Sequence, residues 1–368
     1  MTKKKSRLKF AQEQAESAIK KTNEKINELG AHTSHLYDEL NTIQKLFDDI
    51  RNVPSEKRLE YEKLKKIRLN WMQQAEKIES DYKNAAAKNA GKGAAGVSAG
   101  VAVAALGPTA AMGIATTFGI ASTGTAISTL SGAAATNAAL AWLGGGALAA
   151  GGGGMAAGNA FLALAGPVGW AIAGVALVGS GFLLWKGKSD QNRLEDIFTL
   201  ISKRDVKSYE LAIVEINERI SRIKDETQQL NSAIERTRTF GLDYNLMTEA
   251  KQYELGSYVN LMNSSTQLLV NPIKGLQPKY DKNDLEKYMA FSKRKIDDKQ
   301  RPLIVSLSNL LYKVSLDEKD NILLWKSFKK NKKFLSSIGI SKKDFELLIF
   351  ETVNDTLEHK YRNENLSS

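Results

Sequence analysis

A stretch of 93 residues, from Gly93 to Trp185, contains no Asp, Glu, Lys, Arg or His. Glycine and alanine make up more than half of it, with 21 and 28 residues. Flexible glycine-rich linkers do not carry the large apolar side chains that are interspersed here, such as Met112, Phe118 and Trp142. This stretch, called the charge-free block below, is therefore expected either to enter a membrane or to form the buried core of a helical bundle.

The last 25 residues of the block, Phe161–Trp185, give the clearest membrane signal. About 20 apolar residues in a helix cross the hydrocarbon core of a bilayer. The rest of the block is less hydrophobic, and glycine runs at 144–146 and 151–154 interrupt it. This pattern favours a segment that inserts after the chain has folded in water. The residues expected to contact lipid are Phe161, Leu164, Gly169, Trp170, Ala173, Gly174, Leu177, Phe182 and Trp185.

Lysines stand at both edges of the charge-free block. Lys88 and Lys92 precede it, and Lys186 and Lys188 follow Trp185, which is suited to a membrane interface. Cations on both flanks place the two ends of the block on the same side of a membrane, which implies an even number of crossings. These four lysines are expected to hold the block at an anionic leaflet.

Small residues recur at four-residue spacing within the block. In lipid this spacing lets helix backbones approach closely, within one hairpin or between subunits. The positions expected to pack in this way are Gly96 and Gly100 in one segment and Ala150, Gly154 and Gly158 in another.

Long amphipathic helices are predicted on either side of the block. Apolar residues, with threonines at four of the positions, recur at alternating steps of three and four over residues 19–50 and 209–237 and indicate coiled-coil seams. The expected seam residues are Ile26, Leu29, Leu36, Leu40, Ile43, Ile216, Ile220, Ile223 and Leu230. Pro54 separates the first helix, residues 5–52, from a second that runs to about residue 87. The pair is expected to form an antiparallel hairpin.

No alternating strand pattern is present, so the expected fold class is all-α: a long coiled-coil bundle with an apolar helical hairpin insert and a smaller C-terminal helical region. The later helices are expected at 189–239, 243–269, 283–298, 302–315, 318–333 and 341–361. The predicted organisation is an N-terminal hairpin (1–92), the membrane-inserting region (93–185), helices that return to the bundle (186–270) and a C-terminal helical cap (271–368).

Composition excludes several function classes. The chain has no cysteine and three histidines, which removes thiol chemistry and leaves little imidazole for metal binding or catalysis. We therefore expect no enzyme activity and no cofactor. The net charge is +11, and local clusters such as Lys63, Lys65, Lys66 and Arg68 suit anionic headgroups or a solvated helix face. No nucleic-acid-binding spacing accompanies them.

The basic start of the chain, Met1 to Lys9, is followed by no apolar signal-peptide core. We expect a cytoplasmic protein that associates with, or inserts into, the inner membrane.

Long coiled-coil helices flanking a glycine-rich apolar hairpin resemble, in layout over about residues 10–240, the α-helical pore-forming toxins of the cytolysin A and haemolysin BL type. Residues 122–146 also look like the glycine-zipper segments of assorted bacterial proteins. The resemblance implies an oligomeric, pore-forming or membrane-disrupting effector, with a role in bacterial defence as one possibility. The alternative is a soluble coiled-coil scaffold, or a protein that binds a partner coiled coil, with the block buried as core.

Overall fold

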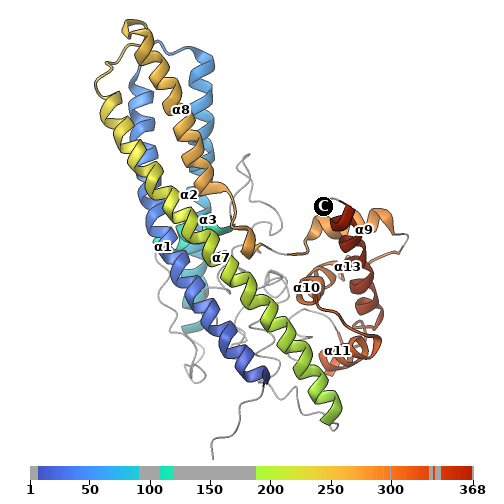
Figure 1. Cartoon of the computed structure of the whole chain (residues 1–368). Helices are drawn as coiled ribbons and strands as arrows, with labels where there is room; N and C mark the ends of the chain where they lie inside the picture. Colours follow the sequence, from blue (N-terminus) through green and yellow to red (C-terminus); the bar gives the residue numbers. More distant parts are fainter. Residues whose placement is uncertain are drawn as a thin grey trace, which may run out of the picture.

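The computed structural model describes residues 7–90, 108–118, 188–277, 279–292, 294–298, 300–330, 335 and 341–366. Helices dominate these residues, and none of them lies in a β-strand (Figure 1). The predicted all-α class is confirmed at this level. The hairpin insert predicted within residues 93–185 lies outside the described residues, apart from one short helix at 108–118.

The two longest helices, α1 (Arg7–Asp49) and α7 (Lys188–Thr237), lie side by side and run parallel. The Arg7 guanidinium lies 3.9 Å from the Asp196 carboxylate near their first residues. Beyond their last residues, the Arg51 amide donates to the Leu242 carbonyl at 2.9 Å. Two contacts in the same order along both helices fix the parallel direction, which Figure 1 shows directly.

Two further helices, α2 (Ser55–Ala90) and α8 (Glu249–Val270), run back from the far ends of α1 and α7 and complete a four-helix bundle. Asn52 turns the first hairpin with a positive φ of 60°, and Gly241 turns the second with φ 90°, where a side chain would be strained. The Asn52 amide donates to both Asp243 carboxylate oxygens, at 3.0 and 3.1 Å. The two turns are therefore tied to each other at the bundle tip, next to the short helix η2 (Tyr244–Leu246).

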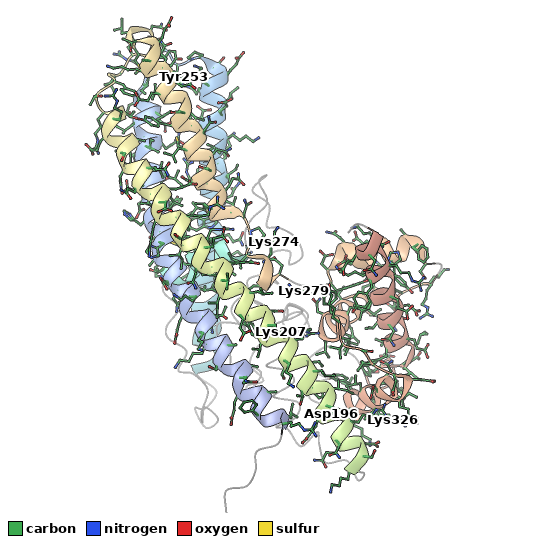
Figure 2. All side chains as sticks on the ribbon, in the orientation of Figure 1. Asp196, Lys207, Tyr253, Lys274, Lys279 and Lys326 are labelled. Atoms are coloured by element: carbon green, nitrogen blue, oxygen red, sulfur yellow. The ribbon has the colours of Figure 1, made fainter. Side chains whose placement is uncertain are left out.

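The bundle core is apolar and closely packed. Trp71 of α2 is fully buried, and its ring lies 5.5 Å, centre to centre, from that of Tyr37 on α1. All nine residues of the predicted seams are buried in this core, at 4% exposure or less. Figure 2 shows how side chains fill the bundle, while Tyr253 at its tip remains 82% exposed. We call this four-helix part the distal half of the bundle.

A second core joins the other ends of α1 and α7 to a C-terminal module. Leu8 of α1 and Leu194, Ile197 and Phe198 of α7 are buried in it. The module is connected to the bundle through η3 (Lys274–Leu276) and comprises α9 (Lys282–Phe291), α10 (Arg301–Leu311), α11 (Glu318–Lys330) and α13 (Leu348–Leu366). We call the part where residues 7–18 and 188–205 meet this module the proximal half.

Several predicted helix boundaries in the C-terminal module were wrong. The helix expected over 283–298 ends at Phe291, and the one expected from residue 341 begins at Leu348. A cap-like pair of hydrogen bonds forms at Ser341, whose hydroxyl donates to the Asp344 carboxylate at 2.7 Å and accepts from the Asp344 amide at 3.3 Å. It closes a succession of turns, however, in which the fully buried Phe345 enters the second core before the helix starts.

Candidate functional site

The described part of the charge-free block is α3 (Pro108–Phe118), and it lies inside the bundle. It packs mainly against α1, with further contacts to α2 and α8. Ala111, Ile114 and Ala115 are at most 1% exposed. Because α3 has no charged side chain, its contacts are made by apolar groups, hydroxyls and backbone atoms. We take α3 and the residues that hold it as the candidate functional site.

Two glycines allow α3 to touch the α1 backbone. A methyl group added to Gly30 of α1 would lie 1.8 Å from the Thr109 carbonyl oxygen, and one added to Gly113 would lie 2.1 Å from the Ile26 carbonyl oxygen. Such distances are far below van der Waals contact, so neither position accepts a side chain without displacement of a helix. This close crossing is the kind of contact predicted for small residues of the block, but it is made with α1 and at positions that were not predicted.

The C-terminal end of α3 is hydrogen-bonded to the loop after α8. The Thr117 carbonyl accepts from the Ile273 amide at 2.8 Å and from the Gln277 side-chain amide at 3.3 Å. The Thr117 hydroxyl donates to the Gly113 carbonyl at 2.7 Å. The last turn of α3 is therefore tied to the loop that carries Lys274, which Figure 2 labels.

A buried polar chain links α2 to α1 and α8 in the distal half. Arg68 of α2 is 1% exposed and donates to the Gln44 side-chain oxygen at 2.7 Å and to the Thr266 hydroxyl at 3.3 Å. Gln44 donates onward to Asp48 at 2.9 Å, and Asp48 accepts from Lys65 at 2.8 Å. Burial lowers the pKa of Arg68 to about 10, which leaves it charged at neutral pH.

This finding corrects one sequence interpretation. Arg68 belongs to the basic cluster that was expected to face solvent or anionic headgroups, yet its side chain is inside the bundle, whereas Lys63, Lys65 and Lys66 are exposed. An apolar face that includes Ile67 and Trp71 carries Arg68 inward with it. The basic cluster alone could not predict that Arg68 is buried, because the helix that packs against α2 decides which of its basic side chains face inward.

The other predicted site residues divide into three groups. Lys188 is exposed at the first position of α7, and Lys88 lies in α2 with its side chain outside the described set. Outside the described residues altogether lie Lys92, Lys186, the nine residues expected to contact lipid, and Gly96, Gly100, Ala150, Gly154 and Gly158. The seam residues are in the first core, as given above.

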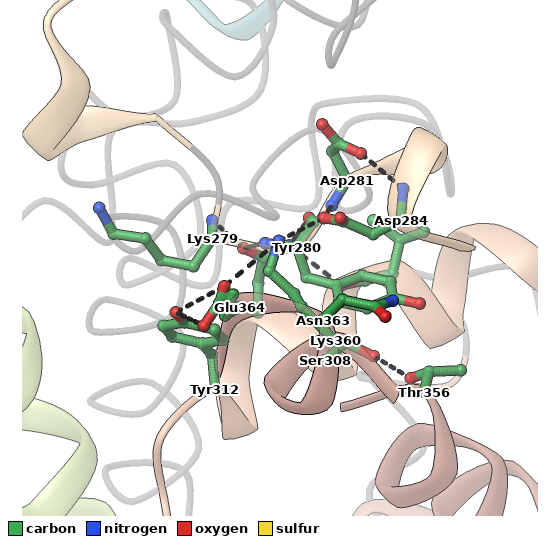
Figure 3. Close-up of polar contacts among 12 residues, drawn as sticks. Lys279, Tyr280, Asp281, Asp284, Ser308, Tyr312, Thr356, Lys360, Asn363 and Glu364 are labelled. Atoms are coloured by element: carbon green, nitrogen blue, oxygen red, sulfur yellow. Dashed lines mark hydrogen bonds and ion pairs between the residues drawn. The ribbon is translucent and has the colours of Figure 1, made fainter. Parts of the chain in front are cut away.

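The C-terminal module has its own polar network, shown in Figure 3. Lys360 of α13 pairs with Asp284 of α9 at 2.6 Å, and the Tyr312 hydroxyl donates to the Glu364 carboxylate at 3.1 Å. A shallow groove of about 270 Å³ is lined by Asp284, Lys287, His359, Lys360, Asn363 and Glu364. Cations and carboxylates are mixed in it and partly neutralise one another, so it presents no preference for a ligand of one charge.

The described residues offer neither a metal site nor a membrane-spanning helix. They contain no group of three or more His, Cys, Asp or Glu that could hold a metal ion. None of the helices they form is long and apolar enough to cross a bilayer, and Phe161–Trp185 lies outside them. Comparison with protein-family models, with curated proteins and with solved structures finds no match to the chain.

Proposed function

We propose that this is a membrane-active helical protein that inserts part of its charge-free block into a bilayer. The observation that carries the proposal is the way α3 is held. Its contacts are apolar or made through the backbone, and no charged side chain of its own anchors it. The hydrocarbon of a bilayer can replace apolar contacts at little cost, whereas it cannot replace an ion pair. The bundle is therefore suited to store an apolar segment and to release it.

In the proposed mechanism the distal part of the parallel pair of α1 and α7 acts as a rigid stalk and oligomerisation surface. Phe161–Trp185 enters the membrane first, because it is the longest strongly apolar segment. Lys88, Lys92, Lys186 and Lys188 hold the ends of the block at an anionic surface. Several copies then assemble into a pore or a membrane lesion, as the layout of the α-helical pore-forming toxins suggests.

The test is dye release from vesicles that contain anionic lipid. Ala173→Arg and Gly174→Glu place a charge in the middle of the inserting segment, at a cost of about 2.5–3.5 kcal/mol in a membrane helix. Each is expected to abolish leakage and to leave the helical circular dichroism unchanged. Asn260→Arg is the matched control, because it adds a charge on the exposed face of α8. Leakage that persists in both block variants would refute insertion by this segment.

A soluble scaffold is the second candidate. The burial of α3 as part of the bundle core favours it, since this is how a soluble protein would use an apolar segment. A scaffold would cause no leakage from any vesicle and would not sediment with membranes. It would still self-associate, or bind a partner, through its long helices.

A further inference from the structure

A carboxylate is buried where α1 and α7 meet in the proximal half. Asp205 of α7 is 0% exposed. Its Oδ1 accepts from Nε and Nη2 of the neighbouring Arg204, at 2.9 and 2.7 Å. Among the described residues its Oδ2 has no hydrogen-bond partner, and one turn further along the Tyr209 hydroxyl is also buried without one. A carboxylate left half-satisfied in a core is costly when it is ionised.

Among the described residues, the surroundings of Asp205 offer little compensation for its negative charge. The ion pair of Arg7 with Asp196 sets the register of α1 and α7, and Figure 2 labels Asp196. In this register Asp205 is level with the stretch of α1 around Ala15, and the buried side chains there are those of Ala11, Ala15 and Ala18. On the same stretch Glu13 is half-buried, and the side chain of Glu16 is outside the described set. Within the described part of the chain, Arg204 is the charged side chain whose field acts on Asp205.

Arg204 also connects this seam to the C-terminal module. Its Nη1 donates to the carbonyls of Leu310 and Tyr312, at 2.8 and 2.7 Å, where α10 ends. On the module side, Lys279 and Tyr361 lie within reach of its charge. The guanidinium therefore has two carbonyl partners that it keeps whether or not Asp205 is ionised. Protonation of Asp205 removes a buried charge without leaving Arg204 unpaired.

The direction of the pH effect follows from these contacts. Burial raises the pKa of Asp205 to about 6, and Arg204 opposes the shift only in part. An exposed aspartate has a pKa of about 3.9. The closed seam therefore binds a proton that the opened seam releases between about pH 4 and 6. The stabilising effect of this proton is complete below about pH 4 and is lost as the pH rises through 6.

We propose that Asp205 is a proton-operated lock on the seam between α1 and α7. When protonated, it lets the proximal halves of the two helices stay packed, and when ionised, it favours their separation. The lock itself does not depend on membrane activity. Its consequence for the charge-free block rests on the proposed function: α7 begins directly after the block, so opening this seam would loosen the end at which the block rejoins the bundle.

Hydrogen exchange of the full chain at pH 5.0 and 7.5, corrected for the intrinsic pH dependence of exchange, tests the lock. Wild-type peptides from residues 7–18 and 194–205 are expected to lose about tenfold in protection between these pH values, given pKa values of about 6 closed and about 3.9 open. Asp205→Asn keeps the shape of the side chain without its charge. It should show high protection at both pH values.

A control variant and a second measurement complete the test. Glu210→Gln, at an exposed position on the same helix, should retain the wild-type pH response. Wild-type protection that is equal at the two pH values would overturn the lock, whatever the variants do. Dye release is measured in parallel on wild type and Asp205→Asn, and it tests the proposed function alone. If protection depends on pH as expected but no dye is released, the lock is supported and membrane activity is refuted.

Discussion

Among the described residues, the distal and proximal halves of the bundle each bury one charged side chain, and they do so in different ways. In the distal half, Arg68 makes hydrogen bonds with side chains of two facing helices, Gln44 of α1 and Thr266 of α8. In the proximal half, Asp205 is bonded only to its neighbour in sequence, Arg204. Each of the two has one buried atom without a partner among the described residues, Nε of Arg68 and Oδ2 of Asp205. Side chains of facing helices therefore stabilise the buried charge of the distal core, whereas in the proximal core only the neighbouring residue does so.

The difference decides which half responds to pH. Burial lowers the pKa of Arg68 to about 10, so this side chain remains charged over the whole physiological range. Burial raises the pKa of Asp205 to about 6, which brings its titration close to neutrality. We infer that the distal half holds a fixed shape while the proximal half is poised to open.

Removing the largest core side chain should damage the distal half most. Trp71 is 0% exposed and packs against Tyr37, so Trp71→Ala is expected to cost about 3–5 kcal/mol in the free energy of unfolding. Urea unfolding followed by circular dichroism measures this. Leu69→Ala, two residues away and 48% exposed, is the control and should cost less than about 1 kcal/mol. Equal losses in the two variants would mean that the distal core is not the stable half.

Removing a hydrogen-bond acceptor of Arg68 should have the next largest effect on stability. Gln44→Leu removes the acceptor at 2.7 Å and leaves a buried cation with a weaker partner, at an expected cost of about 1.5–3 kcal/mol. Thr42→Val removes an exposed hydroxyl that bonds within its own helix, and it should change stability by less than about 0.5 kcal/mol. A neutral Gln44→Leu would show that Arg68 does not need its cross-helix partner, and the contrast with Asp205 would fail.

A single added methyl group should disrupt the contact between α3 and α1. Gly30→Ala places a methyl group against the Thr109 carbonyl and should cost about 1–3 kcal/mol, with faster hydrogen exchange over residues 108–118. Gly256→Ala is the matched control on α8, because space around Gly256 is open. It should stabilise by about 0.5–1 kcal/mol, since alanine is the better helix former. Unchanged exchange at 108–118 in Gly30→Ala would contradict the described packing of α3.

The periodic parts of this fold could be predicted from the sequence, because a repeat of three and four residues identifies the buried face of a helix without knowledge of its partner. This is why Ile26, Leu36 and Ile216 could be chosen before the structure. The parallel pairing of α1 with α7 could not be predicted. About 140 residues separate the two helices, and no short-range sequence pattern indicates which distant helix is the partner. Gly30 gave no signal either, because its role is defined by the α3 backbone that crosses it.

The smallest expected effect lies at the surface end of the Arg68 chain. Lys65 is one turn from Arg68 on α2 and donates to Asp48, but its side chain is 46% exposed, so water can replace the ion pair. Lys65→Ala should cost less than about 1 kcal/mol, and less still at high salt. Combining it with Gln44→Leu in a double-mutant cycle measures whether the surface pair supports the buried cation through Gln44 and Asp48. A coupling energy near zero would place the stabilisation of Arg68 within the core, whereas coupling above about 0.5 kcal/mol would extend it to the surface and make the distal half sensitive to ionic strength.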